Sequence, residues 1–193
     1  TEIRKKASRD LVKKIKQGLV DLNFLDVDFD MEFRQMEHFG PSGWDEAQFI
    51  ISTNPGQPMR PLKDVASGGE LSRIMLAIKT VLADSDDIPT LIFDEIDTGI
   101  SGRTAQKVSE KLSYIAGNHQ VICITHLPQI AAMADAHFEI SKSAKDGSTL
   151  TTIRLLDRKA SVEELARLLG GARITETVRK NALEMKELAD RTK

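Results

Sequence analysis

Disulfides, membrane spans and secretion signals are all missing from this 193-residue sequence. Its single cysteine, Cys123, cannot form an intramolecular disulfide, which favours a reducing, cytoplasmic setting. Its apolar runs are far too short to span a bilayer, and the first residues, TEIRKKASRD, lack the hydrophobic stretch of an intact secretory signal. The 40% apolar and 29% charged residues exclude disordered and collagen-like chains. We therefore expect a folded cytoplasmic protein with no membrane partner.

Several motifs of catalytic sites are missing as well. No Gly-x-x-x-x-Gly-Lys-Ser/Thr segment occurs, so the sequence has no phosphate-cradling loop of that type. It has no Gly-x-Ser-x-Gly elbow and no Cys/His nucleophile pair. Metal-ligand spacing is absent among His38, His119, His137 and Cys123. Cys123 itself lies within an apolar segment, which is typical of a buried small side chain.

The small formal net charge of −2 conceals an uneven distribution. Residues 1–20 contain seven Lys or Arg against Glu2 and Asp10, so the rest of the chain has an excess of seven negative charges. A basic face on this segment indicates either contact with nucleic acid or an ordinary solvated helix face. The length predicts one domain, or at most two.

One apolar stripe on an otherwise charged segment predicts a helix over residues 1–22. The stripe recurs every three or four residues, and fewer than three or four heptads are visible, so it fits both a coiled-coil end and a surface helix. Its members are Ile3, Ala7, Leu11, Ile15, Leu19 and Leu22.

The next segments predict a mixed α/β architecture. Alternating apolar residues favour strands over 27–33 and 48–53, with a turn at 38–43 and a proline-containing loop at 54–61. Beyond these, apolar helical spacing at 71–82 and 108–115 alternates with short apolar strands at 90–93 and 121–124. Continuous apolar strands separated by helices are typical of a mostly parallel sheet flanked by helices.

The last third of the sequence predicts a hairpin and two helices. Residues 138–143 and 149–156 flank Asp146-Gly147, a pair that favours a tight turn. Ser161 with Glu164 has the spacing of a capping box, and Gly170-Gly171 predicts the end of that helix. A final amphipathic helix has Val178, Ala182, Met185 and Ala189 on one side.

Three segments have the composition of a chemical site. Ser67 can cap the helix that follows, with Glu70 returning a bond, and Gly68 and Gly69 leave the helix start open to an anion. Asp94 and Glu95 end a buried strand at the edge where α/β proteins bind ligands, which suits Mg²⁺ and proton transfer from water. His126 ends the next strand. Each pattern alone also fits a plain cap, a solvated loop or a structural histidine.

The order of these segments resembles the ATP-binding-cassette ATPases, in the branch of the structural-maintenance-of-chromosomes (SMC) proteins and most closely its bacterial DNA double-strand-break repair members. ASGGELSR at 66–73 resembles the signature motif, TLIFDEIDTGIS at 90–101 the Walker B motif and D-loop, and VICITHLPQIAAMA at 121–134 the switch-histidine loop. Ala66 and Ser101 stand where the wider superfamily usually has Leu and Asp.

The resemblance implies a role for each site residue. Asp94 would hold Mg²⁺ through water, Glu95 would deprotonate the attacking water, and His126 would contact the γ-phosphate of ATP. The capping residues would bind the γ-phosphate of a nucleotide on a second head, and a loop from Asp97 to Ser101 would cross the dimer interface. The capping residues are Ser67, Gly68, Gly69 and Glu70.

The resemblance also implies that the Walker A half of the head lies elsewhere. Residues 1–22 would then be the end of a returning coiled-coil arm, and 23–193 the C-terminal half of the head. This half alone should be inactive. Its partners would be the N-terminal half, a second head and DNA, and the protein would be located in the nucleoid. The alternatives are a non-catalytic dimerisation module, a transporter-type cassette, which normally keeps both Walker motifs in one short chain, and the head of another SMC-family protein.

Overall fold

The computed structural model describes the whole chain except residues 42, 55, 66, 146–147 and 172, and leaves out the side chains at 144–148. The chain forms two compact units, Thr1–Gly99 with Ile115–Ile124, and Ile100–Tyr114 with Thr125–Lys193. The predicted boundary after residue 22 does not coincide with this division and stays a prediction. Ala66 and the Asp146-Gly147 turn lie outside the described residues.

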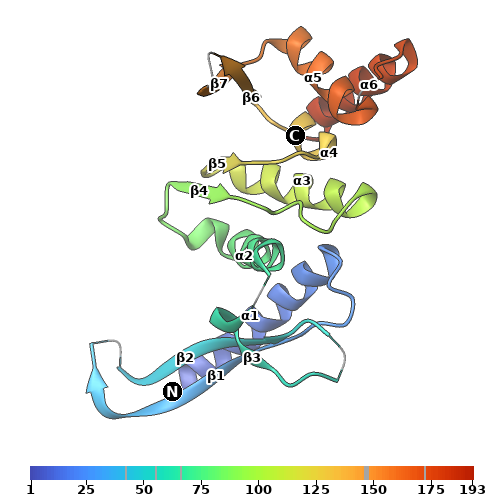
Figure 1. Cartoon of the computed structure of the whole chain (residues 1–193). Coiled ribbons are helices and arrows are strands. Elements are labelled where there is room, and N and C mark those ends of the chain that lie inside the picture. Colours follow the sequence, from blue (N-terminus) through green and yellow to red (C-terminus); the bar gives the residue numbers. More distant parts are fainter. Residues whose placement is uncertain (42, 55, 66, 146–147, 172) are drawn as a thin grey trace. The chain divides into compact units, whose positions relative to one another are not determined.

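Helix α1 (Glu2–Asp21) packs on helix α2 (Gly68–Leu82) through its C-terminal half (Figure 1). Ile15 and Leu19 are fully buried, and Gly18 faces Ala77 of α2, where a Cβ on Gly18 would make an ordinary van der Waals contact at 3.6 Å. At the other end Ile3 is 86% exposed. The predicted stripe is therefore covered at one end only.

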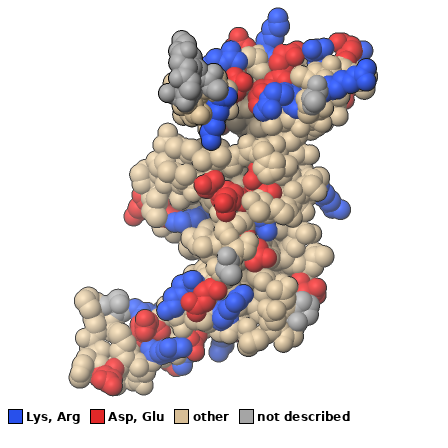
Figure 2. Space-filling model, in the orientation of Figure 1, with Lys and Arg blue, Asp and Glu red and all other residues tan. Residues whose placement is uncertain are grey.

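The basic residues of α1 do not form an uninterrupted patch. Lys16 pairs with Asp28 at 3.0 Å, and Arg4 donates to the carbonyl of Asp45 at 3.0 Å. On the face drawn in Figure 2, basic and acidic side chains are interspersed over this part of the molecule. Contact of α1 with nucleic acid stays a prediction.

The strands that follow form an antiparallel sheet in the order β1 (Asp28–Gly40), β2 (Gly43–Ser52), β3 (Arg60–Pro61). Opposite residues include Phe29 with Ile51 and Met31 with Phe49. Both long strands continue into the predicted turn at 38–43, and a two-residue strand ends the loop predicted for 54–61. The predicted boundaries were wrong here because cross-strand pairing continues beyond the apolar alternation.

A parallel pair lies beside α2 in the first unit. Strands β4 (Thr90–Phe93) and β5 (Gln120–Cys123) pair in register, Phe93 opposite Cys123. The amide of Ile124 donates to the carbonyl of Phe93 at 3.0 Å, so the ladder continues one residue past β5. The connection between them contains α3 (Gly102–Ala116). Short 3₁₀ helices, η1 (Leu62–Asp64) and η2 (Ala83–Ser85), flank α2.

The second unit contains helices α4 (Pro128–Ala132), α5 (Arg158–Gly170) and α6 (Glu176–Thr192) and the hairpin β6 (Phe138–Lys145) and β7 (Ser148–Leu155). Its helices share a small core that is rich in alanine. The buried members are Ala131, Ala132, Met133, Leu165, Ala166, Ala182 and Ala189.

The predicted capping box at Ser161 was wrong. Helix α5 begins earlier, because the carboxylate of Asp157 accepts from the amide of Ala160 at 2.7 Å and caps the helix. Ser161 is buried within the helix, and its hydroxyl contacts Nδ1 of His137 at 2.8 Å. The predicted helix end is confirmed, since Gly171 has a φ of +58° directly after α5.

The α/β class is confirmed. The predicted parallel pairing is present between β4 and β5, whereas the other two sheets of the described chain are antiparallel. The antiparallel sheets pair strands that follow one another closely in the sequence, whereas α3 separates β4 from β5. None of the helices in the described ranges has the length and apolar character needed to cross a membrane.

Candidate functional site

The start of α2 is an open helix N-terminus. Ser67 caps it with its hydroxyl, which accepts from the amide of Glu70 at 3.4 Å, so the predicted cap is confirmed, and the return bond from the Glu70 side chain stays a prediction. Ser67 and Gly68 are exposed, whereas Gly69 is buried. Because the first amides of a helix have no partner within the helix, this exposed end suits an anion.

The acidic pair lies directly after β4. Asp94 and Glu95 are both exposed, and Oδ1 of Asp94 accepts from the amide of Glu95 at 2.9 Å. Glu95 has a φ of +56°, which is uncommon for a residue with a side chain. Its carbonyl accepts from the amide of Thr98 at 3.0 Å and closes a turn. The strained backbone thus reverses the chain immediately after the strand.

The turn formed by residues 94–98 packs against the first turn of α2. The hydroxyl of Ser72 donates to the carbonyl of Asp94 at 2.8 Å. A Cβ on Gly69 would lie 2.9 Å from both the carbonyl oxygen of Glu95 and the Cβ of Thr98, so only glycine fits there. The carboxylate of Glu95 lies over Gly68 in space that a Cβ would fill. The helix start and the acidic pair are therefore one continuous surface.

Arg73 joins the same two segments from the buried side of α2. Its Nη1 donates to the carbonyls of Thr98 at 2.7 Å and Ile96 at 3.3 Å, and its guanidinium lies 5.6 Å from the ring centroid of Phe24. Burial lowers the pKa of Arg73, and the charge of Glu70 opposes this shift. Arg73 has no predicted role in the sequence, although its place on the apolar face of the helix, four residues after Gly69, indicates a buried arginine that needs partners.

The remaining predicted residues lie in different parts of the chain. Asp97 is buried within the turn of the first unit. Ser101 belongs to the second unit, where its carbonyl accepts from the amide of Thr104 at the start of α3. His126 is exposed and also belongs to the second unit. The structure thus brings together the helix start, Asp94, Glu95 and Asp97, and the positions of Ser101 and His126 relative to them stay predictions.

The chain between β5 and α4 is ordered around His126. The amide of Leu127 donates to the hydroxyl of Thr125 at 3.0 Å, and the carbonyl of Leu127 accepts from the first amides of α4. Cys123, before this segment, has its pKa raised to about 12 by burial, with Asp97 and Asp94 adding to the shift. The thiol is therefore protonated at neutral pH, although Cys123 is only partly buried and not fully buried as its apolar segment predicted.

The donor set at the acidic turn fits Mg²⁺ and a phosphate. Carboxylate oxygens are hard ligands, and Mg²⁺ usually takes one or two of them and completes its shell with water and phosphate oxygens. Among the residues that the structure describes, no three His, Cys, Asp or Glu side chains gather as a protein-only metal cage. The exposed carboxylate of Asp94 beside an open helix start suits a cation that is bound together with a phosphate group.

Solved structures show which fold the chain has. An Smc head domain with a coiled coil and joint from Pyrococcus yayanosii matches with a TM-score of 0.57, at 20% identity over 84% of this chain and 29% of that chain. The Smc head domain with an extended coiled coil from Pyrococcus furiosus, bound to the C-terminal domain of ScpA, matches with a TM-score of 0.53, at 21% identity over 86% and 39%. The chain thus has the fold of part of an SMC-type head. No family model matches it.

Curated relatives identify the family. The DNA repair protein RecN of Halalkalibacterium halodurans is 44% identical over 98% of this chain, and that of Bacillus subtilis is 40% identical over the whole chain. RecN of Vibrio cholerae is 44% identical over 94%. The chain belongs to the RecN family. It spans about a third of the length of these relatives, 34%, 36% and 33% respectively.

Proposed function

We propose that this chain is the C-terminal part of a RecN-type ATPase head, which binds and hydrolyses ATP between two heads during DNA double-strand-break repair. The observation that carries the proposal is the direct packing of the α2 start against the 94–98 turn. This packing brings an open helix end, which suits an anion, next to a pair of carboxylates. The RecN relatives and the SMC-type fold support the assignment.

The acidic turn divides the chemistry between two carboxylates. Asp94 would hold Mg²⁺ through water, and Glu95 would orient and deprotonate the attacking water. Bound Mg²⁺ would supply charge neutralisation at the phosphates. The bond from the Glu95 amide fixes one oxygen of Asp94, while the positive φ of Glu95 directs its carboxylate to the helix start. Adjacent residues thereby acquire different surroundings and different roles.

The open start of α2 would bind the γ-phosphate of a nucleotide held by the opposite head. Exposed Ser67 and Gly68 leave its amides accessible, and the helix dipole favours an anion there. His126 would contact the γ-phosphate within its own head, and the loop from Asp97 to Ser101 would cross the interface. ATP bound between two heads would then stabilise the closed dimer until hydrolysis removes the shared phosphate.

The N-terminal half of the head would complete the parallel sheet. Leu91 and Phe93 are buried, but Ile92, Ile122 and Ile124 leave the opposite face of β4–β5 exposed. Parallel sheets are normally covered on both faces, so this face suits the half that contains the Gly-x-x-x-x-Gly-Lys-Ser/Thr motif. Without that half, hydrolysis should be negligible, because phosphoryl transfer depends on positioning and charge stabilisation. The same proposal includes DNA as a binding partner, by family relationship, and a location in the nucleoid.

The decisive test compares this chain alone with the reconstituted head, meaning this chain together with the half that carries the Gly-x-x-x-x-Gly-Lys-Ser/Thr motif. We expect turnover of ATP from the reconstituted head only. Glu95→Gln should keep ATP binding, abolish turnover and accumulate ATP-bound dimers, whereas Glu46→Gln, an exposed control in β2, should match the unchanged head. Robust hydrolysis by the chain alone, or normal turnover by Glu95→Gln, would contradict the proposal.

A non-catalytic dimerisation module is the second candidate. It is favoured by the hairpin, where two cross-strand pairs, Phe138 with Leu155 and Ile140 with Ile153, expose more than half of each side chain. Such a module would associate without nucleotide. Sedimentation of the reconstituted head separates the two functions, since the ATPase proposal requires that dimerisation depend on ATP.

A further inference from the structure

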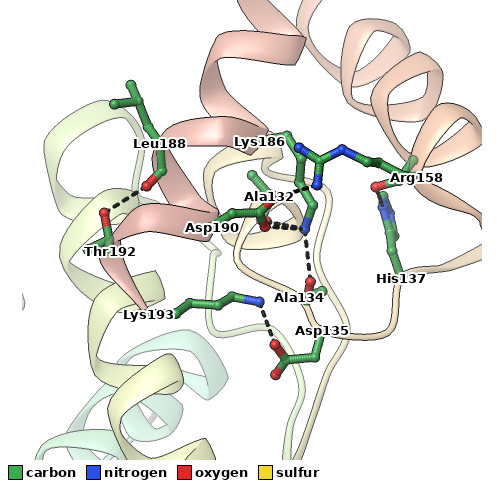
Figure 3. Close-up of polar contacts among 11 residues, drawn as sticks. Ala132, Ala134, Asp135, His137, Arg158, Lys186, Leu188, Asp190, Thr192 and Lys193 are labelled. Atoms are coloured by element: carbon green, nitrogen blue, oxygen red, sulfur yellow. Dashed lines mark hydrogen bonds and ion pairs between the residues drawn. The ribbon is translucent and has the colours of Figure 1, made fainter.

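A lysine is buried in the second unit, far along the sequence from every site residue. Lys186 of α6 is only 8% exposed, and its Nζ donates to the carbonyls of Ala132 at 2.8 Å and Ala134 at 3.0 Å (Figure 3). Asp190, one turn later, lies 3.4 Å from the same ammonium. The charge is thus satisfied by two carbonyls and one carboxylate inside a mostly apolar core.

One of these carbonyls belongs to Ala132, the last residue of α4, and the other to Ala134, two residues beyond it. The last carbonyls of any helix lack partners within it, and a cation is favourable at this end. A five-residue helix has little stability of its own, so its position depends on what holds it. An apolar side chain could fill the space at 186, but it could not satisfy these carbonyls.

Further contacts hold the chain that follows α4. Lys193 pairs with Asp135 at 2.5 Å, and the ring of His137 contacts Ser161 of α5 at 2.8 Å. Ala131 and Ala132 pack directly into the core of α5 and α6, where small side chains permit close approach. Helix α4 is therefore fixed at its C-terminal end by both C-terminal helices.

The N-terminal end of α4 leads directly to His126. Leu127 is its N-cap residue, and the carbonyl of Leu127 accepts from the amides of Ile130 and Ala131 at 3.1 Å each. The bond from the Leu127 amide to Thr125 closes the segment on the other side of the histidine. One turn of helix thus connects the residues held by Lys186 with the backbone that carries the imidazole.

We propose that Lys186 is a positioning residue for ATP hydrolysis, acting through α4 to fix the backbone at His126. The inference rests on the role of His126 in the proposed function. It assigns the C-terminal helices a part in the chemistry, although Lys186 itself touches neither nucleotide nor metal. Misplacement of a catalytic group by about 1 Å costs up to about 100-fold in rate, which sets the scale of the expected effect.

The first test is kinetic and uses the reconstituted head. Lys186→Met should lower kcat for ATP about 10- to 100-fold while KM changes little, because ATP binding relies on other segments. Lys180→Met, at an exposed position of the same helix, should leave both constants unchanged. Lys186→Gln keeps an N–H donor and should recover part of kcat, which covers the case in which the methionine variant folds poorly.

A double-mutant cycle identifies the route of the effect. If Lys186 acts through His126, Lys186→Met should lower kcat no further in a His126→Ala head. Equal losses in both backgrounds would overturn the inference and leave the proposed function intact. An unchanged kcat in His126→Ala itself would refute the role given to that histidine, and the inference with it.

Amide hydrogen exchange supplies a readout that is independent of turnover. Lys186→Met should accelerate exchange at Ile130 and Ala131 by at least about tenfold, because α4 loses its C-terminal support. Amides of the β1–β2 hairpin should keep their protection. Unchanged exchange in α4 would show that Lys186 does not hold it, whatever happens to the ATPase rate.

Discussion

Two adjacent glycines at the start of α2 allow a sharp test of the site. Substituting Gly69 with Ala would place a Cβ 2.9 Å from the carbonyl oxygen of Glu95, 2.9 Å from the Cβ of Thr98 and 3.2 Å from the Thr98 carbonyl. Two of these three atoms are backbone, so the 94–98 turn must move. Overpacking of this kind costs about 1–3 kcal/mol, and the better helix propensity of alanine returns at most about 1 kcal/mol. We therefore expect Gly69→Ala to destabilise the head by about 1–2 kcal/mol.

Gly68→Ala is the matched control for stability. Its Cβ would meet only the carboxylate of Glu95, which is the end of a flexible side chain and can rotate away. The free energy of unfolding should therefore change by less than about 0.5 kcal/mol. The displaced carboxylate and the added methyl group at the open helix start should nevertheless lower ATP turnover.

Urea denaturation and steady-state hydrolysis of the reconstituted head measure the two effects. We expect Gly69→Ala to lose both stability and turnover, and Gly68→Ala to lose turnover alone. Equal stability of the two variants would show that the turn is not held at Gly69. Normal turnover by Gly68→Ala would show that the helix start faces no reacting phosphate.

Three further predictions concern polar groups that are buried or partly buried. Arg73→Met should lower the free energy of unfolding by about 1–3 kcal/mol and also lower kcat, because it removes the donors to the 94–98 turn. Arg103→Met, at an exposed position, should change neither quantity. Equal unfolding midpoints for the two variants would contradict this prediction. A thiol reagent at pH 8 should label Cys123 at least about 100-fold faster in the denatured chain than in the folded chain, since burial raises the pKa of the thiol. Equally fast labelling of the folded chain would show that the thiol is not shielded. Burial lowers the pKa of His137 below 6.5, so the imidazole takes up a proton more readily in the unfolded chain than in the folded one. The free energy of unfolding should therefore decrease as the pH is lowered below about 6.5, and decrease less in His137→Gln. An unfolding free energy that does not change with pH in this range would refute the prediction.

The features that the sequence predicted well are determined by local patterns. The strand before Asp94, the cap at Ser67 and the glycine end of α5 each follow from residues within a few positions of one another. The expected burial of both faces of that strand was wrong, because Ile92 is 68% exposed. The parallel pairing of β4 with β5 also followed, because two short apolar strands separated by a helix can rarely pair otherwise. The motif order then indicated the family.

Competition between similar local signals accounts for the error at α5. Asp157 and Ser161 both precede suitable helix positions, and periodicity alone does not decide between them. Asp157 caps the helix through the amide of Ala160, and the hydroxyl of Ser161 is engaged by His137, which lies 24 residues away in the sequence. Arg73 and Lys186 were missed for the same reason, since each is explained only by carbonyls more than 20 positions away.

The contacts of α2 also determine how the two parts of the proposed reaction can be separated. Gly69 and Arg73 support the turn that carries Glu95 from the same helix whose start would bind the opposite phosphate. A change at either residue should therefore disturb hydrolysis and dimer closure together. Gly68 touches only the side chain of Glu95, so its substitution acts at the open surface without moving the turn. If the two heads share ATP, Gly68→Ala should weaken closure of the dimer even in a Glu95→Gln background, where hydrolysis no longer contributes.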